Sequence, residues 1–162
     1  MESYGWRLFV HPLFESQLQK LAERVERIAS EDPRGYGSHP AAKMLATINH
    51  YIREAIPRAP DSPEFRPGNT LGPGNRHWFR AKFHGRYRLF YRFSTAQKVI
   101  VYAWVNDEGS LRKSGSKTDP YAVFKSMLES GEPPDSFAEL WRASRKVEGP
   151  WPGSVSARGK KE

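Results

Sequence analysis

The sequence predicts one α+β domain, in which a small antiparallel sheet carries an N-terminal helix hairpin and further C-terminal helices. Three observations predict this class. Two segments with the apolar spacing of helices precede residue 57, three strand-like runs lie between residues 78 and 106, and two more helical segments follow. The 162 residues suit a single compact domain.

The first elements are a strand and two helices. Residues 4–11 alternate apolar and polar side chains, as a half-buried strand does. A helix is expected to begin at Pro12, because proline suits a first helical turn, and a second to run from about 40 to 56, with Pro57 ending it. Both carry an apolar stripe that must be buried against another layer. We expect the sheet to be that layer.

The middle of the chain predicts a loop and then the sheet. Residues 57–75 are so rich in Pro and Gly that we expect a long surface loop. The three strand-like runs after it are joined by short turns and should pair antiparallel. The last run, 99–105, is apolar throughout, which is typical of a strand covered on both faces. Helices are then expected after Asp119 and Asp135.

Basic residues alternate along the first two of these central strands. Side chains in a strand point to opposite faces with a period of two, so one face should be apolar and the other cationic. No Asp or Glu occurs between Phe65 and Asn106. From residue 76 onward, the basic residues of this stretch are Arg76, Arg80, Lys82, Arg86, Arg88, Arg92 and Lys98. With a formal net charge of +8, the chain is predicted to bind a polyanion such as nucleic acid.

The composition also excludes several classes of site. The chain has no cysteine, which excludes disulfides, thiolate metal sites and thiol nucleophiles. His11, His39 and His50 lack the spacing of metal ligands, and we expect no metal or other cofactor. No apolar run approaches the roughly 18 residues of a membrane span, so we expect a cytoplasmic protein without a membrane partner. Residues 1–148 are expected to form the domain and residues 149–162 a disordered tail.

Several sequence blocks, in one order, resemble a known family. They are GWRLFVHPLF from Gly5, AAKMLATI from Ala41, FRPGNTLGPGNRHWFRAKF from Phe65, GRYRLFYR from Gly85, WVNDEGSLRKSGSKTDPYAVFKSML from Trp104 and GEPPDSFAEL from Gly131. With the order of elements, these blocks resemble the RelE superfamily of bacterial mRNA-cleaving toxins, and most closely its YhaV branch. The resemblance implies a RelE-like fold.

The resemblance also implies a function and partners. Members of this branch are the toxins of type II toxin-antitoxin pairs. The implied activity is metal-independent endoribonuclease cleavage of mRNA, associated with the ribosome. The implied protein partner is an antitoxin similar to the AbrB-like, swapped-hairpin DNA-binding proteins. Operator DNA would be bound only through the complex of toxin and antitoxin.

Such cleavage uses the 2′-hydroxyl of the RNA as nucleophile and leaves a cyclic phosphate and a 5′-hydroxyl. It needs a base, cations for the charge on the phosphorane, and an acid for the leaving oxygen. By resemblance, Lys82 and Arg80 match the strand lysines placed beside the scissile phosphate. Arg88 matches the arginine that stabilises the transition state, for which a planar bidentate donor is suited.

The chain departs from better-known members after the last central strand, where they place a second arginine and a tyrosine close together. Here Asp107 and Glu108 are candidates for the base, Arg112 for a phosphate clamp, and Tyr121 for an acid or a stacking platform. The alternatives are loop polarity for the two carboxylates and helix packing for the tyrosine. For Arg88 the alternative is a solvated position or a salt bridge to one of those carboxylates.

Further RNA contacts are expected from residues around these positions. They are Arg76, His84, Arg86, Glu108 and Lys113. His84 shares the strand period of Arg80 and Lys82, and histidine is a common proton-transfer group, although a turn histidine can simply be solvent exposed. Two other functions stay open at this point. One is a non-catalytic RNA- or ribosome-binding module, and the other is an inactive toxin that acts in operon repression with its antitoxin.

Overall fold

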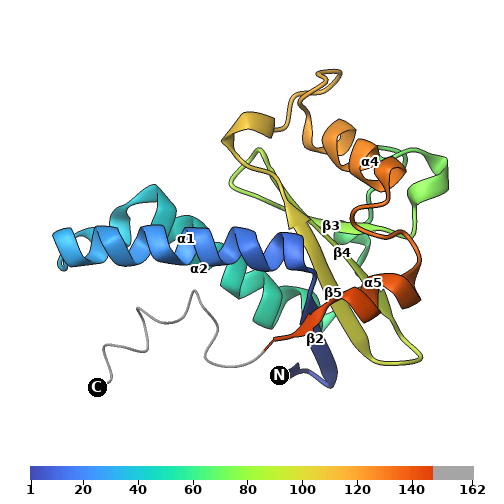
Figure 1. Cartoon of the computed structure of the whole chain (residues 1–162), viewed down its shortest axis with the longest axis horizontal. Helices are drawn as coiled ribbons and strands as arrows, with labels where there is room; N and C mark the ends of the chain where they lie inside the picture. The colour runs from blue at the N-terminus through green and yellow to red at the C-terminus, as the bar shows by residue number, and fades with distance from the viewer. Residues whose placement is uncertain (148–162) are drawn as a thin grey trace.

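The computed structural model describes residues 1–147 and shows a six-stranded sheet with helices on both faces (Figure 1). The strands are β1 (Glu2–Ser3), β2 (Trp6–Val10), β3 (Phe79–Phe83), β4 (Tyr87–Ser94), β5 (Val99–Val105) and β6 (Arg145–Lys146). The helices are α1 (Pro12–Glu31), α2 (Pro40–His50), α3 (Ile56–Arg58), α4 (Pro120–Ser130) and α5 (Phe137–Ala143). The α+β class is therefore confirmed. The tail predicted for residues 149–162 lies outside the described residues.

The sheet is antiparallel where the sequence predicted it and contains one parallel pair. Its order is β1-β2-β5-β4-β3, with β6 also paired to β2. The pairs β3–β4 and β4–β5 are antiparallel, as predicted from their short turns. Strand β2 lies parallel to β5, because the long connection between them carries the chain back to the same end of the sheet. Among residues 1–147, no helix is long and apolar enough to cross a membrane.

The sheet separates two apolar cores. The hairpin of α1 and α2 packs on one face, where Leu8, Tyr91 and Tyr102 are buried. Helices α4 and α5 pack on the other, where Phe90 stacks on Phe124 with 4.3 Å between ring centroids. Strand β5 contributes to both cores, which confirms the prediction of a strand covered on both faces.

Both hairpin helices begin at a His-Pro pair. His11 caps α1 by accepting the Leu13 N–H at Nδ1 (3.2 Å), and His39 caps α2 by accepting the Ala41 N–H in the same way (3.0 Å). The proline that follows occupies the first helical position, where a missing N–H costs nothing. Imidazole thus supplies the acceptor that Ser, Thr, Asp or Asn more often provides.

Helix α2 does not end before Pro57 as predicted, but runs on through a π-helical turn, Tyr51–Ala55, into α3. In this turn the Ile56 N–H bonds to the Tyr51 carbonyl. The Ile52 carbonyl would then need the N–H of Pro57, which proline lacks. Instead it accepts a hydrogen bond from the buried Tyr102 hydroxyl at 2.8 Å. The sheet therefore stabilises a helix that its own sequence would interrupt.

Candidate active site

The hydroxyl of Tyr121 lies between two buried arginines. It accepts hydrogen bonds from Arg80 Nε at 2.7 Å and from Arg88 Nε at 3.1 Å. Arg80 and Arg88 are each 7% exposed, and Tyr121 is 5% exposed. A third guanidinium, that of Arg112, lies over the tyrosine ring, 4.9 Å from its centroid. Strands β3 and β4, the loop before α4 and α4 itself thus bring three cations to one phenol, which we call the Tyr121 cluster.

Asp119 positions two members of the Tyr121 cluster at once. As the N-cap of α4 it accepts the Tyr121 N–H at Oδ2 (3.0 Å). Its Oδ1 accepts from Arg112 Nη1 and from the Lys113 N–H, both at 2.7 Å. The Asp-Pro pair was predicted only as a helix start. Its second role in holding Arg112 was missed, because no short-range signal links positions 112 and 119.

Asn106 fixes the strand that carries Arg88. Its Oδ1 accepts the Arg88 backbone N–H at 2.6 Å, and its Nδ2 donates to the carbonyls of Arg86 (3.1 Å) and Ser110 (2.7 Å). The side chain is 3% exposed. It connects the loop after β5 to the start of β4, a role that no local sequence pattern predicts.

Each buried arginine keeps one donor edge free. Arg88 Nη1 donates to the carbonyls of Gly85 and Tyr87, and Arg80 Nη1 donates to the carbonyl of Glu64. Within residues 1–147, the Nη2 atom of neither arginine has a hydrogen-bond partner. Neither Nη2 atom is fully buried, so both can be reached from outside. The backbone and Tyr121 therefore orient both guanidinium groups while one N–H₂ of each remains available to an anion.

Lys82 extends the cluster to the surface. It is exposed and lies directly opposite Arg88 in the β3–β4 ladder. Like charges at directly opposed positions destabilise a sheet. The register therefore places two cations next to each other on one face of the sheet.

The prediction that one sheet face is cationic is wrong in part. Arg80 and Arg88 do share a face, but α4 covers it, because Phe90 of the same face packs on Phe124 and Tyr121. Arg92 is also covered: its guanidinium lies between the rings of Trp78 and Phe137. The sequence period located the face correctly but could not show that a helix packs over it.

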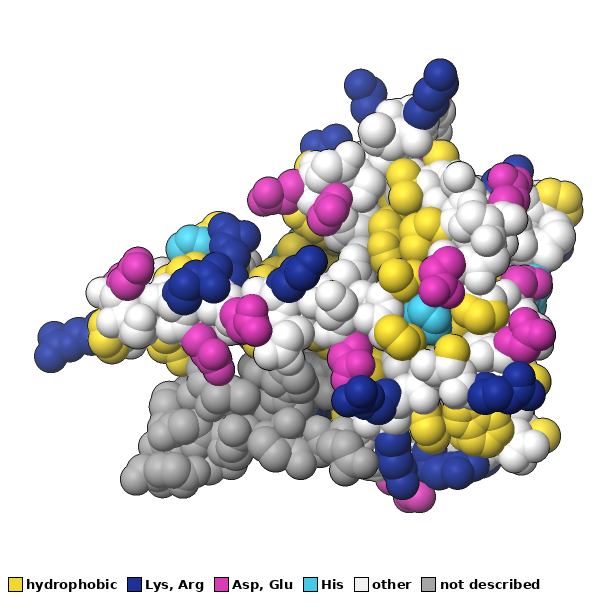
Figure 2. Space-filling view, viewed as in Figure 1, with side chains coloured by type: hydrophobic (Ala, Val, Ile, Leu, Met, Phe, Trp, Pro, Cys, Tyr) yellow, Lys and Arg dark blue, Asp and Glu magenta, His cyan; other side chains and the backbone are white. Residues whose placement is uncertain are grey.

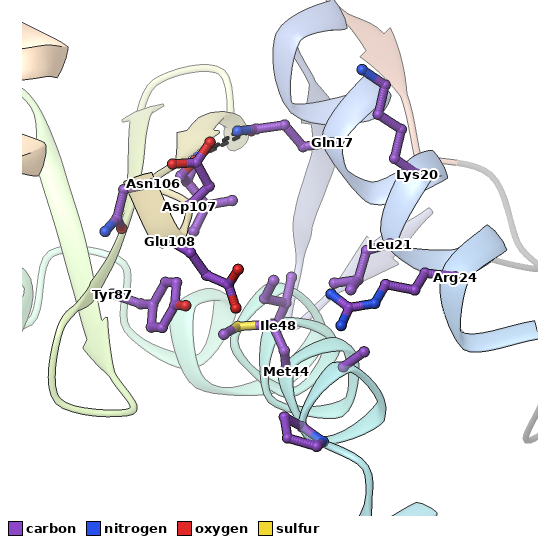
Figure 3. A pocket seen from close by; sticks show the side chains of 13 residues that line it. Gln17, Lys20, Leu21, Arg24, Met44, Ile48, Tyr87, Asn106, Asp107 and Glu108 are labelled. Atoms are coloured by element: carbon purple, nitrogen blue, oxygen red, sulfur yellow. Dashed lines mark hydrogen bonds between the residues drawn. The ribbon is translucent and has the colours of Figure 1, made fainter. Parts of the chain in front are cut away.

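Asp107 and Glu108 lie away from the Tyr121 cluster. They line a pocket against α1 and α2, where Figure 3 shows Glu108 pointing inward beside Tyr87, with Lys20 and Arg24 on the opposite wall. The Asp107 carboxylate accepts hydrogen bonds from the Gly109 N–H (2.9 Å) and the Ser110 hydroxyl (3.1 Å). It thus caps its own turn, and the geometry does not support either residue as the base or as an RNA contact at the cluster.

His84 also departs from its predicted position. Strand β3 ends at Phe83, and His84 adopts a left-handed φ of 48° in the turn. Its ring lies 2.8 Å from the Thr47 hydroxyl on α2, measured between Nε2 and Oγ1. The strand period that placed it beside Lys82 stops one residue too early.

Of the other predicted RNA contacts, Arg76 and Arg86 form hydrogen bonds that hold loops in place, and Lys113 is exposed. Arg76 donates twice to the Asn69 side chain and so holds the long loop. Arg86 Nε donates to the Arg112 carbonyl at 3.1 Å, which braces the loop that carries Arg112. The Lys113 side chain is exposed beside the cluster. No group of three or more His, Asp or Glu side chains in residues 1–147 is placed to hold a metal ion.

Comparison with known proteins places the chain in a family. Residues 8–145 match the family model described as a toxin with endonuclease activity, of a toxin-antitoxin system. The chain is 44% identical over 145 residues to "Ribonuclease toxin YhaV" of Escherichia coli strain K12, which covers 88% of this chain and 94% of that protein. It is 46% identical over 138 residues to "Toxin YhaV" of Escherichia coli O6:H1 strain CFT073, covering 84% and 90%. No solved structure gives a significant match. The chain therefore belongs to the YhaV family of toxins with endonuclease activity, which act within toxin-antitoxin systems.

Proposed function

We propose that this toxin is an endoribonuclease that cleaves mRNA at the Tyr121 cluster. The observation that carries the proposal is the pair of guanidinium donors on one phenol oxygen, with a third guanidinium over the ring. The name of the 44% identical relative, a ribonuclease toxin, supports RNA as the substrate. We propose the cytoplasm as the place of action, because mRNA is found there.

The cluster would stabilise the charge that builds up on the phosphate. In the proposed step the 2′-oxygen attacks phosphorus, the bond to the 5′-oxygen breaks, and the products are a cyclic phosphate and a 5′-hydroxyl. The free Nη2 donors of Arg80 and Arg88 would bind the non-bridging oxygens, with Arg112 and Lys82 on either side. Donors fixed before the reaction stabilise a transition state most, because they need no reorganisation.

Tyr121 would donate a proton to the leaving 5′-oxygen. Its hydroxyl already accepts two N–H groups, so its own hydrogen is free to point outward. After the transfer, the same two guanidinium donors face the oxygen on which the negative charge remains. A phenol held in this way can serve as a general acid without a neighbouring carboxylate.

The proposal assigns no carboxylate base. Both oxygens of Asp119 are occupied by Arg112, Lys113 and the start of α4, and Asp107 lies in the pocket on α1 and α2. Lys82, which lies opposite Arg88 in the β3–β4 ladder, could take the 2′-hydroxyl proton, and it would do so only in its neutral form.

Membership of a toxin-antitoxin family implies an antitoxin partner. We propose that this partner is an AbrB-like, swapped-hairpin DNA-binding protein, and that operator DNA is contacted through it. We also propose that the ribosome presents the mRNA. Alignment for in-line attack removes a large part of the barrier, and the ribosome would supply part of that alignment.

The test is to incubate the purified protein with mRNA, both free and in translating ribosomes, and to map the cut ends. Arg88→Ala is compared with Arg142→Ala, which removes an exposed arginine from α5. We expect cuts with cyclic phosphate and 5′-hydroxyl ends that disappear only in Arg88→Ala. A chelator added to free RNA should not stop them. RNA binding without cuts in either substrate form would instead identify a binding module.

A further inference from the structure

A second cavity opens beside the Tyr121 cluster. It has a volume of about 430 Å³ and lies between the loop 112–119, the beginning of α4 and Thr70 of the long loop. Arg112 and Tyr121 line its wall and also belong to the cluster. A ligand bound at the cluster would therefore extend into this cavity without leaving the surface.

The cavity carries positive charge on two lysines that form no ion pair with residues 1–147. Lys117 and Lys125 line it, and neither has an acidic partner within residues 1–147. The one acidic residue on its wall is Asp119, whose carboxylate is already bonded to Arg112 and two backbone N–H groups. Figure 2 shows Lys and Arg side chains projecting at the top of the molecule, where Figure 1 places the loop before α4.

Hydrogen bonds hold the backbone of the loop 112–119. The Arg112 N–H donates to the Arg86 carbonyl at 3.0 Å, and the N–H groups of Ser116, Thr118 and Asp119 all bond within the loop. Gly72 of the long loop has a φ of 94°, and a Cβ added there would lie 3.7 Å from Lys125 Nζ. The long loop thus lies against the Lys125 side chain. The backbone that carries Lys117 and the loop beside Lys125 are therefore formed before any ligand arrives.

We propose that this cavity binds the phosphate adjacent to the scissile phosphate in the RNA chain, with Lys117 and Lys125 as its ligands. The inference rests on the proposed function, which puts the scissile phosphate at Tyr121. RNA carries a phosphate at every nucleotide, so a chain cut at the cluster must place another one nearby. Phosphate contacts of this kind fix the register of a nucleic acid and do not read its bases. The two lysines are positioning residues in this scheme.

The first experiment measures binding of a 2′-O-methyl RNA oligonucleotide, which cannot be cut at any position. Lys117→Gln/Lys125→Gln is compared with Lys20→Gln/Lys43→Gln, which removes the same charge from α1 and α2. We expect the first variant to bind roughly 3- to 10-fold more weakly and its salt slope to fall by about 0.7 for the lost phosphate contact. The second variant should bind within about twofold of the wild type, since its lysines lie on the helix hairpin. Equal losses in both variants would overturn the subsite.

The second experiment locates the phosphate. Single linkages of the oligonucleotide are replaced by uncharged methylphosphonate, one at a time. One replacement should weaken binding to the wild type and have no further effect on Lys117→Gln/Lys125→Gln, because the same contact is already lost. Additive losses at every linkage would overturn the proposal.

Cleavage assays separate the two proposals. On cuttable RNA, Lys117→Gln/Lys125→Gln should raise KM and leave kcat within about twofold, as expected for lost uniform binding. A fall in kcat alone would contradict a positioning role. If the wild type cuts no RNA, the proposed function fails, while the binding comparison with uncuttable RNA still decides the subsite.

Discussion

At the scale of single residues, two arginines are buried under a helix, where Arg80 has two hydrogen-bond acceptors and Arg88 has three. Buried charges are tolerated when they are hydrogen-bonded, and one phenol oxygen serves Arg80 and Arg88 together. Two basic groups and a proton donor are thereby fixed within hydrogen-bond distance. The same contacts that make the burial tolerable also form the proposed active site.

Tyr121→Phe tests this double role. The change leaves two buried guanidinium donors without their shared acceptor, so the free energy of unfolding should fall by about 1–3 kcal/mol. Loss of the proton donor should lower kcat by about 10²–10⁴-fold. Urea unfolding and cleavage assays measure the two effects. Tyr102→Phe is the matched control. It removes the hydrogen-bond donor of the Ile52 carbonyl and should lower stability but not kcat. Equal loss of kcat in both variants would contradict the catalytic role.

Arg88→Lys tests the geometry of one guanidinium. Lysine keeps the charge but cannot bond Tyr121 and a phosphate oxygen with one planar group. We expect kcat to fall far more than RNA affinity. Steady-state cleavage and RNA binding should be measured on the same preparation. If rate and binding fall together, Arg88 has a binding role and the proposed mechanism is wrong.

At the scale of elements, the start of α1 depends on a neutral histidine. His11 is buried, and this burial lowers its pKa, although the nearby Glu132 opposes the shift. Protonation of Nδ1 would remove the acceptor for the Leu13 N–H, so the cap exists only in the neutral form. Histidine in this position therefore makes helix α1 sensitive to acid.

The pH dependence follows from the direction of that shift. Because the folded-state pKa of His11 lies below the unfolded value of about 6.5, the unfolded chain binds more protons. The stability from neutral His11 is full above about pH 6.5 and is lost as the pH falls below it. His11→Asn keeps a cap that does not titrate. Urea unfolding from pH 8 to 5 should show a steeper acid loss for wild type, and parallel curves would contradict the assignment.

At the scale of the whole molecule, the two ends of the described chain meet on one strand. Strand β6 pairs with β2, the Val147 N–H donates to the Leu8 carbonyl, and Val147 is 1% exposed. The Met1 amino group donates to the Val147 carbonyl at 2.8 Å. Residues near the C-terminus therefore complete the sheet on which the first helix is built.

Two truncated chains test the contribution of β6 and Val147 separately from that of the tail beyond them. A chain ending at Gly149 keeps β6 and Val147, and the sequence predicts that its melting temperature matches that of the full chain. A chain ending at Ser144 loses both and should be less stable by about 2–3 kcal/mol from the burial of Val147 alone. Thermal unfolding measures the difference. A large loss in the first truncation would contradict the predicted disorder of residues 149–162.

The sequence by itself determined the α+β class, the order of the main helices and strands, the antiparallel central strands and the shared face of Arg80 and Arg88. These follow from periods and turns that neighbouring residues fix. The tertiary structure decided that α4 covers that face, that Asp119 joins Arg112 to Tyr121, that Asp107 lies toward α1 and α2, and that β2 runs parallel to β5. Each of these is a contact between distant segments. Local spacing says which way a side chain points along its own strand, but not which layer will pack over it.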